Sequence, residues 1–384
     1  MEWKEVTLGE ISSKIGDGLH GTPKYDDEGP YYFINGNNLN CGKIIIKDDT
    51  KRVGKDEFVK NQKELNEQTI LVSINGTIGN VAKYNNELCI LGKSACYINV
   101  IKEVDKEFIY YVLTSANFKR NITNEATGTT IKNVSLKQMR EYKFNIPCNI
   151  SDQRRIASIL SSLDRKIELN YKINADLEEM AQAIFKNWFV DFEPFKDGKF
   201  VDSELGMIPE GWKVGTLGEL CNFKRGKNLL TKNAIDEGVP VVAGGLEPSC
   251  YHNIANTGAP VITVSGSGAN AGFMRMYHVP VWASDCSFID ISCENFYFVY
   301  CFLKVNSKLL KHAQTGAVQP HVKPSDIHDF ELVIPDKESI YDFQDKVKPF
   351  FDKIALIQKE NSCLSLLRDT LLPRLMSGEL EVPE

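Results

Sequence analysis

The sequence has no long hydrophobic run. Nothing in it approaches the roughly 18 consecutive apolar residues that a membrane-spanning helix needs. The first residues, Met1 to Glu5, have neither the basic start nor the apolar stretch of a secretory signal. We therefore expect a cytoplasmic protein with no membrane partner.

Metal-binding and catalytic spacings are also missing. The ten cysteines include no CxxC pair, and the six histidines form no HxxxH or HExxH pair. We interpret the cysteines as reduced, mostly buried small side chains, and we expect no zinc site. No nucleophile–base set stands out either, so the sequence predicts no catalytic residue and no cofactor or metal site in this chain.

The sequence also lacks a surplus of positive charge. The net charge is −6; the segments 151–204 and 336–384 are acidic, whereas 1–150 and 205–335 are close to neutral. Proteins that bind nucleic acid alone are normally basic, because neutralising phosphates supplies much of their affinity. Composition therefore favours a protein that either does not bind nucleic acid or does so with a partner that supplies positive charge.

Two short stretches resemble functional motifs, but the residues around them do not fit. Residues 16–21 match GxGxxG, but Thr22-Pro23 and a polar loop follow where the dinucleotide fingerprint needs a helix. Pro335-Asp336 could begin a nuclease carboxylate set, yet no acidic residue lies two positions before a lysine in the next twenty residues. Neither motif supports an enzyme.

What the sequence does contain is an internal repeat. The opening Trp3-Lys4 with Leu8-Gly9-Glu10 recurs as Trp212-Lys213 with Leu217-Gly218-Glu219. Thr127-Gly128 and Ile146-Pro147 recur as Thr315-Gly316 and Ile334-Pro335, each time just before a long helical pattern. The chain is thus predicted to hold two copies of one unit, a globular body followed by a helix.

Each helical pattern is a heptad seam with alternating steps of four and three residues. The first seam runs through residues 156, 160, 163, 167, 170, 174, 177, 181, 184 and 188, and the second through 343, 347, 350, 354, 357, 361, 364, 368, 371 and 375. Rods of about 35 residues are about 50 Å long, too long for one small body to cover, so we expect them to pair antiparallel. The alternative is that each helix packs only on its own body.

Local signals complete the helical prediction. Asn170, Asn174 and Asn361 interrupt the apolar seams and are interpreted as devices that fix the register of the helices. Ser151 or Asp152 is expected to cap the first helix. The aromatic run 188–195 is expected to anchor the end of that helix, and residues 196–199 to form a turn.

These patterns predict an α+β fold with two globular mixed α/β bodies. The expected boundaries are 1–150 for the first body, 151–204 for the central coiled-coil helix and its linker, 205–335 for the second body, and 336–384 for the C-terminal coiled-coil helix. The two long helices separate the bodies and relate them by a pseudo-two-fold axis.

Polar, glycine-bent loops occur at corresponding places in both bodies. Asn, Gln, Ser, Thr, Lys and Arg on such loops can contact base edges and phosphates, although ordinary turn chemistry accounts for any single loop. The predicted DNA contacts are Thr22, Lys24, Tyr25, Asn35, Asn37, Asn38, Asn75, Lys132, Asn133, Lys224, Arg225, Lys227, Ser265, Ser267, Asn270, Gln319, His321 and Lys323.

The chain resembles the specificity subunits of Type I restriction–modification systems. The resemblance covers the whole sequence and rests on the repeated openings, the Ile-Pro element before each helix, and three short stretches. These are Asp152-Gln153-Arg154-Arg155-Ile156, Trp188-Phe189-Val190-Asp191-Phe192, and the ending 371–380. One departure is Glu338-Ser339-Ile340, which replaces the Asp-Gln-Arg entry in the second helix.

The resemblance implies a non-catalytic subunit whose bodies are target-recognition domains, each for one half of a bipartite double-stranded DNA sequence. The helices would set the spacer and dock two methyltransferase subunits and, through them, a restriction/translocase subunit. S-adenosylmethionine, ATP and Mg would belong to those partners. The alternative is a scaffold whose coiled coil joins two protein-binding domains.

Overall fold

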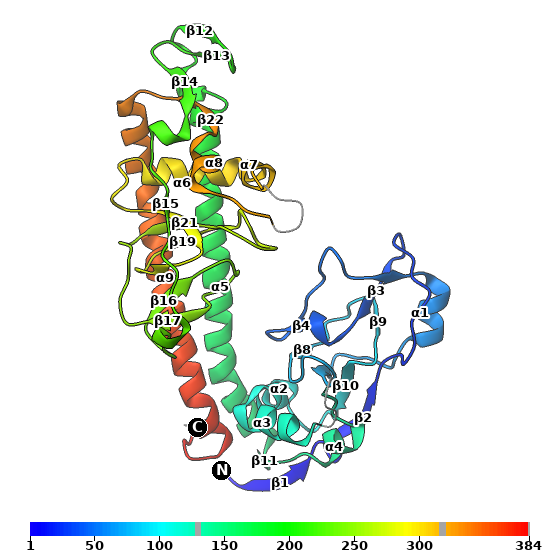
Figure 1. Ribbon diagram of the computed structural model, residues 1–384. Coiled ribbons are helices and arrows are strands. Elements are labelled where there is room, and N and C mark those ends of the chain that lie inside the picture. Colours follow the sequence, from blue (N-terminus) through cyan, green and yellow to red (C-terminus); the bar gives the residue numbers. More distant parts are fainter. Residues whose placement is uncertain (127–131, 315–319, 383–384) are drawn as a thin grey trace. The chain divides into compact units, whose positions relative to one another are not determined.

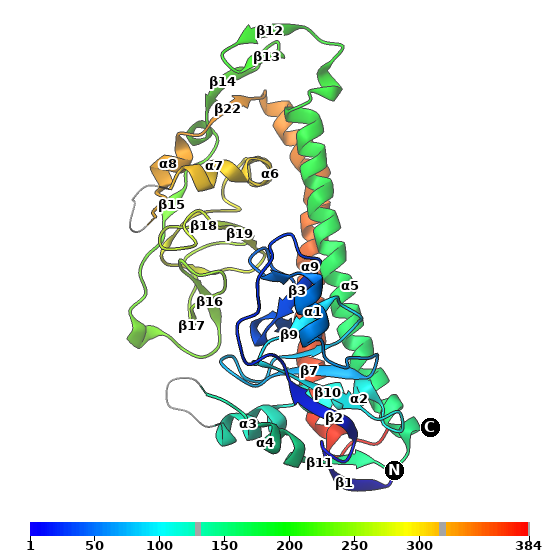
Figure 2. The ribbon, with the colours of Figure 1, turned by 90° about the vertical axis from the view of Figure 1, so that its right-hand side faces the viewer.

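The computed structural model describes residues 1–126, 132–314 and 320–382. The chain divides into two compact units (Figures 1 and 2), one formed by Met1–Leu169 with Asn361–Glu384 and the other by Asn170–Glu360. Two long helices, α5 (Ile150–Phe189) and α9 (Lys337–Met376), each contribute a segment to both units.

The first unit, unit 1, contains the N-terminal body. Its strands are β1 (Trp3–Thr7), β2 (Ser12–Asp17), β3 (Tyr31–Ile34), β4 (Leu39–Asn40), β5 (Lys43–Ile44), β6 (Arg52–Val53), β7 (Thr69–Ser73), β8 (Val81–Lys83), β9 (Cys89–Leu91), β10 (Ala95–Val100) and β11 (Lys143–Pro147). Its short helices are η1 (Gly36–Asn38), α1 (Lys55–Asn61), α2 (Lys106–Thr114), α3 (Ala116–Glu125) and α4 (Leu136–Glu141).

The second unit, unit 2, contains the C-terminal body. Its strands are β12 (Phe200–Ser203), β13 (Gly206–Pro209), β14 (Lys213–Thr216), β15 (Lys224–Arg225), β16 (Val239–Val242), β17 (Cys250–His252), β18 (Val261–Ser265), β19 (Met274–Tyr277), β20 (Trp282–Ala283), β21 (Cys286–Asp290) and β22 (Glu331–Ile334). Its short helices are η2 (Glu193–Phe195), η3 (Leu217–Glu219), η4 (Thr231–Asn233), α6 (Phe296–Val305), α7 (Ser307–His312) and α8 (Pro324–His328).

Three sheets of the first body recur with the same strand order in the second body. The order β2-β10-β7-β8 in unit 1 recurs as β15-β21-β18-β19 in unit 2, and β6-β3-β9 recurs as β17-β16-β20. The third match is between the pairs β1-β11 and β14-β22. Even the parallel contacts correspond, since β3 runs parallel to β9 and β16 runs parallel to β20. The repeat predicted from the opening and closing motifs thus extends to these three sheets, whereas β4-β5 of unit 1 and β12-β13 of unit 2 have no counterpart.

The central strands are buried along their whole length. Every residue of β7, β10 and β18 is buried, as expected for strands covered on both faces. In unit 1 these strands pack with α2 and α3 over one core, and in unit 2 α6 contributes an aromatic-rich segment to the core. The sheets therefore give each body a fixed frame for its loops.

The predicted heptad seams are confirmed. All twenty seam positions are buried or half-buried. In unit 1 the first part of α5 and the last part of α9 share a core through Ile156, Leu160 and Leu375. In unit 2 the last part of α5 and the first part of α9 share a core through Phe185, Phe343 and Val347, and Figures 1 and 2 show these segments side by side. The pairing is antiparallel, and the alternative of helices packed only on their own bodies is wrong.

The polar seam residues lie where the two units divide. Asn170 is 1% exposed and donates a hydrogen bond of 2.7 Å to the Glu360 carboxylate. Asn361 is also buried, and Asn174 is half-buried. Their role in fixing the register stays a prediction, and buried amides at seam positions are the observation that supports it.

The start of each long helix is capped by a residue that the sequence patterns did not predict as a cap. Helix α5 begins one residue before Ser151, and Asn149 Oδ1 accepts a hydrogen bond of 2.9 Å from the Ser151 backbone N–H. The predicted cap at Ser151 or Asp152 is therefore wrong. At the second helix, Asp336 accepts 2.8 Å hydrogen bonds from the Ser339 backbone and from Trp212 Nε1. A candidate nuclease carboxylate is thus a helix cap.

A glutamine ties each long helix to its body: Gln153 is buried and Gln344 is half-buried. The Gln153 side chain accepts from Asp105 N and donates to the Pro147 carbonyl, both at 2.9 Å. In unit 2, Gln344 accepts from Tyr297 N at 3.0 Å and donates to the Glu294 carbonyl at 2.9 Å. The departure from Asp-Gln-Arg at the second helix entry is therefore met by a glutamine further along the helix.

The linker behaves as predicted. In unit 2 the Trp212 ring lies 4.7 Å from that of Phe195 and 5.8 Å from that of Phe189, so the aromatic run does anchor the end of α5. Residues 196–198 form the expected turn, and the β12–β13 hairpin follows. In unit 1 the C-terminal segment returns to the start of the chain, where Gly378 lies against the Trp3 ring.

The structure bears on the expectations about the cysteines and about membrane-spanning helices. Burial raises the pKa of the Cys286 thiol to about 12, and Cys89, Cys96, Cys221 and Cys301 are also buried, but Cys41, Cys148 and Cys363 are exposed. The cysteines are thus less uniformly buried than predicted. In the described ranges, no helix is both long and apolar enough to span a bilayer.

Candidate DNA-recognition surface

In both bodies, a glycine-bent loop meets the segment that precedes the last short helix. In unit 1, Asn75 forms an isolated antiparallel bridge with Asn133, and the Asn75 side-chain amide donates to Asn133 Oδ1 at 3.1 Å. In unit 2, Ser267 bridges His321 in the same way. We call these two places the polar junctions of unit 1 and unit 2.

The backbone of the two junctions is closely matched. Gly76 and Gly268 both have positive φ, 72° and 81°, which favours glycine. Gly76 N donates to the Lys132 carbonyl at 3.3 Å, and Gly268 N donates to the Pro320 carbonyl at 3.1 Å. The two bodies therefore hold different side chains on the same bend.

In unit 1, Ser94 joins two of the predicted loops. Its hydroxyl donates to Asn35 Oδ1 at 3.0 Å and accepts from Gly36 N at 2.8 Å, while its carbonyl accepts from Ile74 N at 3.0 Å. The structure thus brings Asn35 close to the junction formed by Asn75 and Asn133.

Asp285 takes the corresponding place in unit 2. Its carbonyl accepts from Gly266 N at 3.1 Å, just as Ser94 accepts from Ile74. Its carboxylate accepts hydrogen bonds from the Arg225 guanidinium and from the Ser267 hydroxyl. Arg225, Ser267 and His321 therefore form one cluster.

Two predicted contacts are buried and form hydrogen bonds inside the fold. Asn38 is 5% exposed; its Oδ1 accepts from Asn35 N, and its amide donates to the Ile45 carbonyl at 3.0 Å. Ser265 is 3% exposed and donates to the Gly244 carbonyl at 3.3 Å. Both side chains form hydrogen bonds within their own body. This favours a role in holding loops in place and not in contacting DNA.

The remaining predicted contacts that the structure describes are exposed or half-exposed. Tyr25 bridges Val53, and its ring lies 6.0 Å from that of Phe33. Asn270 donates to the Gly244 carbonyl at 3.3 Å. The exposed members of the set are Thr22, Lys24, Tyr25, Asn37, Lys132, Lys224, Lys227 and Lys323. Gln319 lies outside the described residues.

Sequence reasoning missed Ser94 and Asp285. Each hydrogen bonds to a predicted contact that is far away in the chain, 59 residues for Asn35 and 60 for Arg225. Pairing of β21 with β15 and with β18 brings Asp285 to its partners. Only the strand register could have revealed these two residues, and the sequence motifs do not give it.

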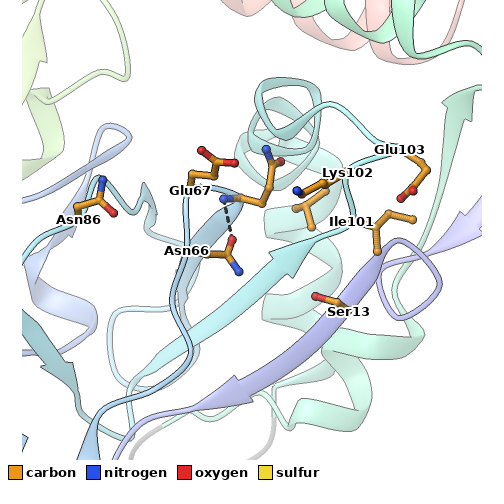
Figure 3. Close-up of a pocket in the computed structure, with 9 residues that line it drawn as sticks. Ser13, Asn66, Glu67, Asn86, Ile101, Lys102 and Glu103 are labelled. Atoms are coloured by element: carbon orange, nitrogen blue, oxygen red, sulfur yellow. Dashed lines mark hydrogen bonds between the residues drawn. The ribbon is translucent and has the colours of Figure 1, made fainter. Parts of the chain in front are cut away.

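The structure also contains cavities, of which one lies at the predicted DNA contacts and another lies away from them. One cavity of about 700 Å³ is lined in unit 1 by Ser13, Asn66, Glu67, Gln68, Asn86, Val100, Ile101, Lys102 and Glu103 (Figure 3). None of these residues belongs to the predicted contacts. A cavity of about 440 Å³ in unit 2 is lined by Arg225, Gly266, His321, Lys323, Pro324 and Ser325, so it lies at the polar junction.

Two bodies with three corresponding sheets and differing polar junctions, each joined to paired long helices, define a tandem recognition protein. The family model described as the Type I restriction modification DNA specificity domain matches residues 1–179 and 209–365. The chain therefore belongs to the family of type I restriction–modification specificity subunits, and it carries the DNA specificity domain twice.

Individual relatives agree with this assignment. The MjaIX specificity subunit of Methanocaldococcus jannaschii is 29% identical over 389 residues, which cover 94% of this chain and 87% of that protein. The HindI specificity subunit of Haemophilus influenzae is 25% identical, covering 99% of this chain and all of that protein. The crystal structure of the S subunit from M. genitalium has the same fold, with a TM-score of 0.59, 23% identity, and coverage of 98% and 96%.

Proposed function

We propose that each body is a target-recognition domain for one half of a bipartite double-stranded DNA sequence, residues 1–150 for one half and 205–335 for the other. The observation that carries this proposal is the pair of polar junctions. The backbone bend is the same in both, but the amides Asn75 and Asn133 in unit 1 are replaced by Ser267 and His321 in unit 2. A common frame with different hydrogen-bonding groups suits two different half-sites.

The contacts fall into two chemical kinds. Exposed lysines such as Lys132 and Lys323 suit phosphates, which position the protein without specifying sequence. The amides of Asn35 and Asn75 and the guanidinium of Arg225 suit base edges. The predicted contacts other than Asn38 and Ser265 remain our proposed interface.

The long helices are proposed to set the spacer and to dock two methyltransferase subunits. In unit 1 the exposed apolar side chains on the helices are Leu169, Leu366 and Leu367. In unit 2 they are Tyr171, Met180, Tyr341 and Leu356. Large apolar side chains exposed on both helical segments of each unit favour a protein partner.

The chemistry of modification and cleavage is proposed to belong to the partners. The methyltransferase subunits would bind S-adenosylmethionine, and a restriction/translocase subunit would bind ATP and Mg. This chain would then be a non-catalytic subunit in the cytoplasm. The near-neutral bodies are consistent with this arrangement, because the partners can supply much of the positive charge that DNA binding requires.

The proposal is tested by DNA binding of the assembled complex. The chain is co-expressed with its methyltransferase subunits, the methylated motif is mapped, and Kd is measured for that duplex and for a scrambled duplex of equal composition. We expect the target to bind at least roughly 1,000-fold more tightly at physiological salt. Equal affinity for the two duplexes would contradict the assignment of the bodies as target-recognition domains.

A further inference from the structure

The Arg225 guanidinium is held in place by Asp285, which is itself held by Ser267. Asp285 Oδ1 accepts a hydrogen bond from Arg225 Nη2, and Asp285 Oδ2 accepts one from the Ser267 hydroxyl. The Arg225 side chain remains 45% exposed. The arginine is therefore anchored at one edge of its guanidinium and still accessible.

Gly266 allows this position. A Cβ on Gly266 would lie 2.2 Å from Arg225 Nη1 and 2.8 Å from its Cζ. The guanidinium consequently lies directly on the backbone at residue 266, and any larger residue there would displace it. A fixed guanidinium loses less side-chain entropy on binding than a free one.

The surroundings distinguish a base contact from a phosphate contact. Asp285 largely offsets the charge of Arg225, and a carboxylate beside the guanidinium disfavours an approaching phosphate. A guanidinium keeps its planar set of N–H donors, and this geometry matches the O6 and N7 acceptors of guanine. Lys323 lines the same 440 Å³ cavity and can take a neighbouring phosphate.

Unit 1 has an acceptor where unit 2 has Arg225. Ala95 pairs with Ser73 and Cys286 pairs with Ser265, so these two central strands can be superposed by register. One residue further, Cys96 pairs with Asp17, whereas Ser287 pairs with Arg225.

The two side chains at this place have opposite hydrogen-bonding character. The Asp17 carboxylate lies 2.7 Å from His20 Nε2. A carboxylate cannot donate to guanine, so this contact belongs to one body only.

We propose that Arg225 recognises a guanine in the half-site bound by the second body, with Asp285 and Ser267 as positioning residues. The proposal rests on the proposed function of the bodies as target-recognition domains. It predicts that this half-site contains a guanine whose recognition depends on Arg225.

The test is competition binding with the assembled complex carrying R225A. Duplexes in which each base pair of the mapped motif is replaced in turn compete with the target. We expect discrimination at one G·C pair of one half-site to fall by roughly 5- to 150-fold, with the other half-site unchanged. D285N should give a smaller loss of discrimination at the same base pair. If Asp285 had a merely structural role, the loss would not be confined to one position.

K227A provides a matched control, because Lys227 is an exposed cation two residues from Arg225. It should weaken binding to all duplexes alike. Unchanged discrimination in R225A, or relaxation at a position without guanine, would overturn the proposal. If R225A does not assemble, R225Q, which keeps a planar end group, is measured in the same way and decides. A wild-type complex without sequence preference would instead contradict the proposed function.

Discussion

Lys132 and Lys323 are exposed lysines beside the two polar junctions. If each contacts a phosphate, replacing it removes one released counterion without changing any base contact. Lys323→Ala should therefore weaken binding to target and non-target duplexes by the same factor and reduce the salt slope by about one. Kd measured over a range of salt concentrations checks this. A change in base preference would show that Lys323 contacts a base.

Asp336 shows how a single carboxylate stabilises a helix start. Burial by itself would raise the pKa of Asp336, but hydrogen bonds from Ser339 and Trp212 outweigh burial and hold the pKa below its usual value. Because the folded-state pKa is lowered, the stabilisation is present above the unfolded pKa and is lost as pH falls through the folded pKa.

Asp336→Ala should consequently lower the free energy of unfolding by about 1 kcal/mol at neutral pH. The difference from wild type should shrink at acid pH, as the carboxylate becomes protonated in both states. Denaturant titrations at a series of pH values measure it. Asp345→Ala, on an exposed position of the same helix, is the control and should have little effect. An equal effect of both variants would rule out the capping role.

Asn37 and Asn38 mark a limit of inference from residue type. Both were predicted to contact DNA, yet Asn37 is exposed, while Asn38 is 5% exposed and donates to Ile45 and Thr50. Adjacent asparagines have the same chemistry, and only the tertiary neighbours decide which one is used internally. Residue type therefore identifies candidate contacts but does not separate them from structural residues.

At the scale of elements, the long helices were predictable because their signal is local. A heptad pattern repeats every few residues, so α5 and α9 follow from the sequence together with their buried faces. The body strands have two to six residues and pair with partners far away in the chain. Their register depends on non-local contacts, which is why Ser94 and Asp285 were missed.

The proposal that the paired helices set the length of the DNA spacer can be tested by lengthening a helix. In unit 2, Asn170 contacts Glu360, and antiparallel pairing then places Asn174 near Ile357. Inserting four residues after Asn174 adds about 6 Å of helix. If the helices set the distance between the bodies, the unread spacer of the methylated motif should lengthen by one or two base pairs, with both half-sites unchanged.

The one-sided insertion should also cost affinity, because the polar seam residues lose their register. A second four-residue insertion before Ile357 restores the facing seam and should recover most of that affinity while keeping the longer spacer. Methylome sequencing and Kd measurements follow the two effects separately. A motif with its original spacer after either insertion would show that the helices do not set this distance.

At the scale of the whole chain, the repeat carries most of the functional argument. Matched openings, matched Ile-Pro elements and two seams were visible in the sequence, and the structure extends the match to the sheet order of each body. The sequence could not predict which bases each junction contacts. The two junctions share one backbone bend but carry side chains that form different hydrogen bonds. Asn75 and Ser267 differ in this way.

The most direct test of two independent recognition domains is an exchange of one body. Residues 1–147 end at the Ile-Pro element before α5 and can be replaced by the equivalent segment of another specificity subunit. Methylome sequencing of cells that express the chimera with the methyltransferase gives the motif. We predict that one half-site changes to that of the donor, while the other half-site and the spacer stay the same. A motif altered in both halves would contradict independent recognition by the two bodies.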